Sequence, residues 1–162
     1  MEQISKYFNA EKSESLLFIF VGLIAMIVAS YFLIKLRQPF YNGMAYPFIA
    51  VALIQLTVGC TVYLKSTKDE ERVIQFMHSD QSKILTDEIP RMQTVMKNFT
   101  VYKWIEISLL IIGCTLLFIF AKESFWNGLG LGLCIQSGFL LWLDFFAENR
   151  GRAYLNHLMT IL

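Results

Sequence analysis

The sequence predicts an all-α membrane protein, an antiparallel bundle of four transmembrane helices with a small cytoplasmic helical cap. Apolar residues make up 56% of the 162 residues, and the mean hydropathy is +0.50. Four stretches with few charges, at about 15–36, 44–64, 102–121 and 128–147, approach or exceed the roughly 20 apolar residues that cross a hydrocarbon core as a helix. Because these stretches occupy most of the chain, we expect one domain over residues 1–162.

The first stretch is expected to be a retained helix and not a cleaved signal peptide. Val28, Ala29 and Ser30 loosely fit a cleavage site, but the preceding segment is not net positive and the apolar run continues beyond them. In the last stretch, Gly128 and Gly132 have a spacing that favours close helix contact. We expect this contact to be intramolecular, with a dimer face as the alternative.

The segment 65–101, between the second and third stretches, is predicted to be a folded cytoplasmic helical loop. Thr67 followed by Glu70 has capping-box spacing, which predicts the start of a short helix. A turn is expected near Asp80, and a second helix is expected to begin near Asp87 with Pro90 in its first turn. No helix breaker follows, so this helix should continue to about residue 121 and be roughly 50 Å long.

The tail 149–162 is predicted to be an amphipathic helix that packs against the loop and forms the cap with it. Its apolar stripe ends at Leu162. Methionine suits adaptable binding surfaces and also fills ordinary cores, so either role is open for the cap. The candidate interaction surface comprises Met77, Met92, Met96, Tyr154 and Met159.

The distribution of basic residues predicts the topology. All lysines and arginines except Lys35, Arg37 and Lys122 lie in the N-terminal segment, in residues 65–103 or in the tail. Short loops rich in Lys and Arg stay cytoplasmic, which predicts that both termini and the loop are cytoplasmic. We expect a multi-pass protein of a bacterial inner membrane.

Several polar side chains are expected at membrane depth, where they are candidate functional groups. One interpretation is a polar pocket, or partner-binding site, that opens to the cytoplasm. The other is an internal network that ties the helices together. The candidate residues are Gln55, Glu106, Gln136, Asp144, Glu148 and Arg152.

The sequence contains no catalytic signature. It lacks a glycine-rich phosphate loop and the histidine spacing of a zinc enzyme. Cys60, Cys114 and Cys134 all fall within apolar stretches and have no metal-binding spacing. The net charge is +1, and no extended basic run indicates nucleic-acid binding. We therefore expect no metal, no cofactor and no nucleic-acid partner.

Two resemblances bear on function. Residues 148–156 resemble a motif of the MAPEG family, four-span enzymes of glutathione and eicosanoid metabolism, at Glu148, Arg152, Ala153 and Asn156. Tyr154 replaces the histidine of that motif, which in the family leads into the second span and here ends the chain. The four short-looped spans with both termini inside resemble the architecture of bacterial immunity proteins that block pore-forming colicins.

We expect a non-enzymatic membrane protein that acts by protein–protein recognition, as a toxin-immunity protein or an accessory subunit. Membrane lipid and a protein partner are the expected partners, and an oligomer is possible. The alternative is a small membrane-embedded enzyme, or a lipid- or small-molecule-binding protein, that uses the polar pocket. A channel or transporter would need several copies of the chain, because no span carries a continuous polar stripe.

Overall fold

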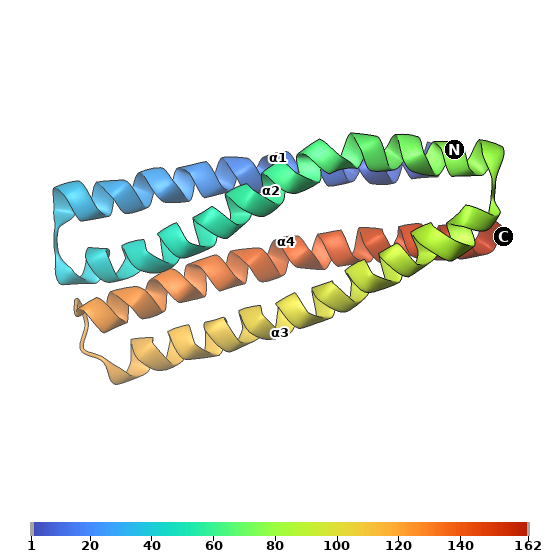
Figure 1. Ribbon diagram of the computed structural model, residues 1–162. Coiled ribbons are helices and arrows are strands. Elements are labelled where there is room, and N and C mark those ends of the chain that lie inside the picture. The colour runs from blue at the N-terminus through green and yellow to red at the C-terminus, as the bar shows by residue number, and fades with distance from the viewer. Residues whose placement is uncertain (1, 162) are drawn as a thin grey trace.

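The computed structural model describes residues 2–161, and over this range all secondary structure is helical. Four long helices are α1 (Glu2–Tyr31), α2 (Pro39–Ser79), α3 (Ile89–Ile119) and α4 (Phe125–Ile161), as Figure 1 shows. Two π-helical turns complete the fold, η1 (Phe32–Leu36) after α1 and η2 (Ile84–Glu88) before α3. Each long helix is long and apolar enough to cross a membrane. Leu162, the end of the predicted apolar stripe, lies outside the described residues.

The two ends of the molecule differ in what they contain. Both termini and the α2–α3 connection lie at one end, called here the terminal end, and the α1–α2 and α3–α4 connections lie at the other, the hairpin end (Figure 1). At the hairpin end, Arg37 adopts a left-handed conformation with φ of 51°, and its backbone N–H donates to the carbonyl of Phe32. Pro39 then begins α2, where its missing N–H needs no partner.

The second hairpin is held by Asn127 in the first turn of α4. Its side-chain amide donates to the carbonyl of Leu117 at 3.1 Å, near the end of α3. Its backbone N–H donates to the hydroxyl of Ser124 at 3.2 Å, so Ser124 caps the helix. These bonds connect the last turn of α3 to the first turn of α4.

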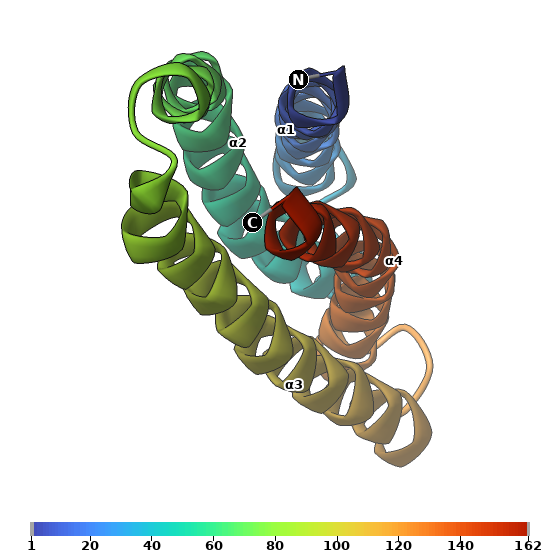
Figure 2. The ribbon, with the colours of Figure 1, turned by 90° about the vertical axis from the view of Figure 1, so that its right-hand side faces the viewer.

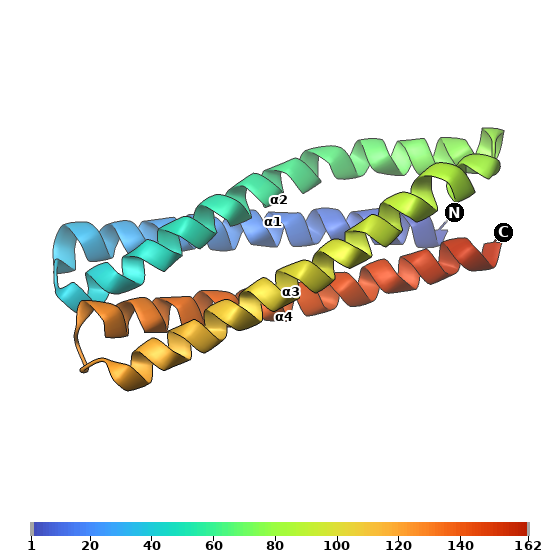
Figure 3. The same ribbon diagram turned by 60° about the horizontal axis from the view of Figure 1, so that its bottom comes forward.

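The helices make extensive contacts in three pairs, α1 with α2, α3 with α4, and α2 with α4. Figure 2, viewed from the terminal end, and Figure 3 show α3 crossing the bundle obliquely. Among the long helices, the extensive contacts of α3 are with α4 alone. Its buried residues are Ile89, Met92, Glu106 and Gly113, so most of its circumference is accessible.

Glycines allow α2 and α4 to approach closely at the hairpin end. A Cβ added to Gly43 would lie 2.0 Å from the carbonyl oxygen of Phe125, and one added to Gly128 would lie 1.9 Å from that of Phe40. A Cβ on Gly132 would lie 3.0 Å from a backbone oxygen of α2. The Gly128–Gly132 spacing therefore serves an intramolecular contact, as expected.

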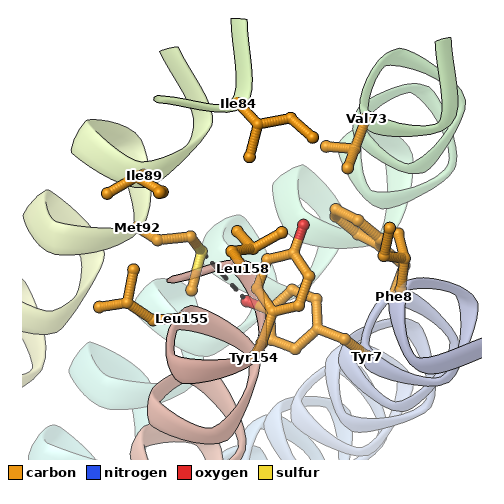
Figure 4. Packing of buried hydrophobic residues seen from close by; sticks show 10 residues of the cluster. Tyr7, Phe8, Val73, Ile84, Ile89, Met92, Tyr154, Leu155 and Leu158 are labelled. Carbon is orange, nitrogen blue, oxygen red and sulfur yellow. Dashed lines mark hydrogen bonds between the residues drawn. The ribbon is translucent and has the colours of Figure 1, made fainter. Parts of the chain in front are cut away.

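The terminal end instead has a core of large side chains drawn from all four long helices and η2, which Figure 4 shows from close by. Tyr7 of α1 and Tyr154 of α4 stack at 4.1 Å between ring centroids, and the hydroxyl of Tyr7 lies 3.8 Å from the sulfur of Met92. The buried members are Ile4, Tyr7, Phe8, Val73, Ile84, Ile89, Met92, Tyr154, Leu155 and Leu158. The sequence analysis did not assign the N-terminal residues of α1 to this core.

The predicted start of a separate short helix at Thr67 is wrong. Helix α2 is continuous from Pro39 to Ser79, so Thr67 lies inside it and residues 65–79 are its last turns, not a separate loop helix. No residue between 64 and 79 breaks the helix, and α1 covers this part of α2 with an interhelical bond from Ser66 to the carbonyl of Phe8. The expected turn near Asp80 is present, and η2 with α3 forms the long helix expected from about residue 87.

Candidate functional site

The polar residues predicted at membrane depth fall into separate groups. The carboxyl groups of Glu106 on α3 and Asp144 on α4 lie beside each other across the contact between these helices. Glu106 is 6% exposed, and one of its carboxylate oxygens has no hydrogen-bond partner in the described residues. The expectation that these acids lie at a similar level is confirmed.

Glu148, one helical turn beyond Asp144, is paired with cations on both sides. Lys103 of α3 donates to one of its carboxylate oxygens, and Arg152 donates to the other at 2.7 Å. These two cations hold the pKa of the Glu148 carboxyl below its usual range, with the hydrogen bond from Lys103 as the larger cause. The predicted Glu148–Arg152 pair therefore exists, and Lys103 adds a bridge between α3 and α4.

The two glutamines do not join this group. Gln55 of α2 is fully buried, and both polar atoms of its amide lack a partner within the described residues. Gln136 of α4 is 4% exposed. No hydrogen bond in the part of the chain described connects either amide with Glu106 or Asp144. The structure thus does not assemble the six predicted residues into one pocket.

Another charge network lies nearer the terminal end, centred on Glu88 of η2. The side chain of Glu88 is fully buried and accepts two bonds from Arg91, at 2.6 and 2.9 Å, and one from the Tyr154 hydroxyl at 3.1 Å. Arg72 of α2 reaches the same carboxylate at 3.4 Å. Asp69 contacts both arginines. This network ties α2, η2, α3 and α4 together.

Sequence reasoning missed the role of Glu88, although the Glu88–Arg91 spacing of three residues on one helix was visible. An i, i+3 pair indicates a favourable contact but not burial, which depends on the segments that meet there. Sequence reasoning also missed the ion pair between Glu14 of α1 and Arg150 of α4. That pair joins residues far apart in the chain, so no local sequence pattern predicts it.

Burial affects the two stacked tyrosines of the terminal-end core, which lie outside the apolar spans. Desolvation raises the pKa of the Tyr154 hydroxyl well above its usual range, and the adjacent Glu88 carboxylate raises it further. Desolvation also raises the pKa of Tyr7, with a smaller contribution from Glu11. Both phenols therefore remain protonated wherever the protein is folded at ordinary pH.

The candidate cap surface is mostly core. Met92 is fully buried and Tyr154 is 4% exposed, so neither is available to a partner. Met77 and Met96 are partly buried against the same core. Met159 is exposed. Most residues of the candidate cap surface therefore fill the space between helices.

A groove runs between α3 and α4 on the terminal side of Glu148, with a volume of about 490 Å³. It is lined by Met96, Lys97, Thr100, Glu148, Arg152, Leu155 and Asn156. Of the six predicted polar residues, Glu148 and Arg152 line this groove. Glu106 and Asp144 do not line it, so this groove does not give a ligand access to the acid pair.

Comparisons with protein-family models, curated proteins and solved structures find no match for this chain. Within the described residues, no group of three or more His, Cys, Asp or Glu side chains is arranged to hold a metal ion.

Proposed function

We propose that the chain is a multi-pass membrane protein that recognises a partner protein within the bilayer and performs no catalysis. In this proposal the four helices form an antiparallel transmembrane bundle, and the terminal end is the cytoplasmic cap. Its concrete forms are a toxin-immunity protein or an accessory subunit of a bacterial inner membrane.

Membrane insertion is supported by the length and apolar composition of the four long helices, and the accessible hydroxyls within the spans are compatible with it because they bind to their own helix. Thr57 and Thr61 of α2 donate to backbone carbonyls four residues earlier, at 2.8 and 2.7 Å. Ser108 and Thr115 of α3 do the same at 2.8 Å. Polar groups that face lipid have no water to bind, so they must be satisfied by their own helix.

The observation that carries the recognition proposal is the exposure of α3. Only 11% of the apolar part of α3 is buried in the bundle, against 17% for α1, 28% for α4 and 33% for α2. A helix in a four-helix bundle normally packs against two neighbours, whereas α1 is covered mainly by α2, and α3 mainly by α4. A shallow apolar depression of about 430 Å³ lies along it. A transmembrane helix of a partner protein would cover this face.

The pairing of charges favours recognition over catalysis. Glu88 and Glu148 each have their carboxylate oxygens occupied by cations, and the acid pair lies away from the groove. A general acid or base must come within hydrogen-bond reach of a substrate. Buried pairs of this kind instead connect helices.

Site-specific photocrosslinking in the source membranes tests the proposal. A benzophenone amino acid replaces Ile105 in the depression on α3, and the matched control replaces Ile24 on the exposed face of α1. We expect a discrete protein adduct from position 105 and none from position 24. Equal crosslinking from both positions, or lipid adducts alone, would contradict the proposal.

The orientation is tested separately with reporter fusions. A fluorescent protein fused after Leu162 should fluoresce, and alkaline phosphatase inserted at Lys122 should be active, because these positions lie on opposite sides of the membrane in the proposal. The reverse pattern would place the terminal end outside the cytoplasm and refute the topology.

A further inference from the structure

The groove between α3 and α4 combines a cationic wall with apolar surroundings. Lys97 of α3 is exposed, and Arg152 of α4 keeps 65% of its side chain accessible although it binds Glu148. Lys103 also binds Glu148, so this carboxylate in the groove wall is shared by Arg152 and Lys103 and does not engage Lys97. Lys97 forms no ion pair within residues 2–161. The groove therefore retains positive charge and free N–H donors for an anion.

The position of the groove along the helices matches the head-group layer of a bilayer. Lys97 lies five residues beyond the apolar stretch that begins at residue 102, which is about 8 Å along a helix. The polar layer on each side of a hydrocarbon core is about 5–8 Å thick. An anionic group in the groove would thus lie at the depth of lipid phosphates.

Large aromatic side chains are exposed on the membrane side of the same groove. Trp104 follows Thr100 by four residues on α3 and is 67% exposed, and Phe145 precedes Glu148 by three residues on α4 and is 56% exposed. Residues spaced by three or four lie on one helix face. Aromatic side chains therefore lie just beyond the groove lining on the side toward the spans.

We propose that this groove binds an anionic phospholipid, with the phosphate at Lys97 and Arg152 and the acyl chains against Phe145, on the side of Trp104 away from the depression on α3. Basic sites between helices on the cytoplasmic side suit anionic head groups, which are abundant in that leaflet. Charge-assisted N–H bonds to phosphate oxygens supply the recognition. The inference rests on the proposed membrane insertion and does not depend on the identity of a protein partner.

Native mass spectrometry of the purified full-length protein in a non-ionic detergent tests the site. Phosphatidylglycerol and phosphatidylcholine are added in equal amounts, and bound lipid is counted for each. The test variant combines Lys97→Gln with Arg152→Gln. Glu148 keeps its bond to Lys103 in this variant, so no buried carboxylate is left without a cation.

The matched control combines Lys35→Gln with Lys122→Gln, which removes the same charge from exposed positions at the hairpin end. We expect the wild-type protein and the control to prefer phosphatidylglycerol, and the test variant to bind it about ten-fold more weakly. Thermal unfolding midpoints of the two variants should agree, which shows that the test variant folds.

Three outcomes would overturn the assignment. Equal binding of the two lipids by the wild-type protein would show no anionic site, and equal losses in both variants would place the effect outside the groove. Displacement of phosphatidylglycerol by inorganic phosphate at the same concentration would identify a free anion as the ligand. Extraction of the chain from membranes at alkaline pH would instead refute insertion, so failure of the proposed function is recognised separately.

Discussion

The hairpin end and the terminal end of this protein are held together by different means. At the hairpin end, α2 and α4 meet through glycines whose hydrogens face backbone carbonyls, as at Gly43 and Gly128. At the terminal end, large side chains form a core, and a fully buried carboxylate at Glu88 is surrounded by cations. The hairpin end also has a smaller apolar cluster around Met44 and Phe48, so what distinguishes it is the close backbone approach at its glycines, whereas the terminal end has the larger core and the buried charge.

The difference corresponds to the two solvents that the proposed topology assigns to these ends. In lipid, apolar side chains gain nothing by leaving the surroundings, so close backbone approach and small residues hold helices together. In water, burial of apolar area is the dominant favourable term. In the proposed topology, apolar residues of the helices are exposed where they face lipid and buried where the terminal end faces water.

The largest effect is expected at Gly128. Gly128→Ala places a Cβ against the carbonyl oxygen of Phe40, and because backbone cannot give way, α2 and α4 must separate. We expect a loss of about 3 kcal/mol or more of folding free energy, measured as reduced monodisperse protein in detergent and a lower unfolding midpoint. The control is Gly138→Ala, whose Cβ would meet nothing within 4 Å. Equal behaviour of the two variants would show that the close contact is unnecessary.

Removal of the buried carboxylate should have the next largest effect. Glu88→Gln removes the buried anion that Arg91 and Arg72 share and leaves them only Asp69, and breaking a buried ion pair in this way costs up to about 3 kcal/mol. Denaturant unfolding in detergent measures the change. Asp87→Asn is the matched control, because Asp87 is the adjacent acid and is exposed. A loss from Asp87→Asn as large as that from Glu88→Gln would refute a specific role for Glu88.

The stacked tyrosines predict a dependence on alkaline pH. The pKa of Tyr154 is raised on folding, so its contribution to stability is complete below the unfolded pKa of about 10 and is lost as the pH rises above that value. Tyr154→Phe should lower stability at neutral pH by about 1.5 kcal/mol, because the bond to Glu88 is lost. It should also reduce the alkaline decline. The exposed Tyr102→Phe should do neither, and an unchanged pH profile in Tyr154→Phe would contradict the assignment.

The smallest effect is expected at Gly151. This glycine lies at the terminal end, so its replacement can be compared directly with that of Gly128 at the hairpin end. A Cβ on Gly151 would lie 2.4 Å from the terminal methyl of Met96. A methionine tip can rotate away, and alanine favours the helix over glycine by about 1 kcal/mol. Gly151→Ala should therefore change the thermal midpoint little or raise it. A loss comparable to that of Gly128→Ala would show that the terminal end is as rigid as the hairpin end.

The sequence predicts the features that local patterns determine. Length and hydropathy indicate four helices suited to membrane crossing, and the break near Asp80 follows from its neighbours. The helix start predicted at Thr67 is wrong because a capping sequence begins a helix only where the preceding residues are not helical, and here α2 continues through it. Of the site, the Glu148–Arg152 pair lies on one helix and could be predicted. The Lys103 and Glu88–Tyr154 contacts join different helices and required the arrangement of the bundle.

The contact between Glu88 and Tyr154 has a consequence for biosynthesis. The two residues are 66 positions apart, so at about 5–20 residues per second Glu88 is synthesised about 3–13 s before Tyr154. During that interval Arg91, three residues away, is already available to neutralise the acid. The nascent chain thus contains a counter-ion for the Glu88 carboxylate before α4 is made. When α4 packs, Tyr154 adds a hydrogen bond to a carboxylate whose charge is already neutralised.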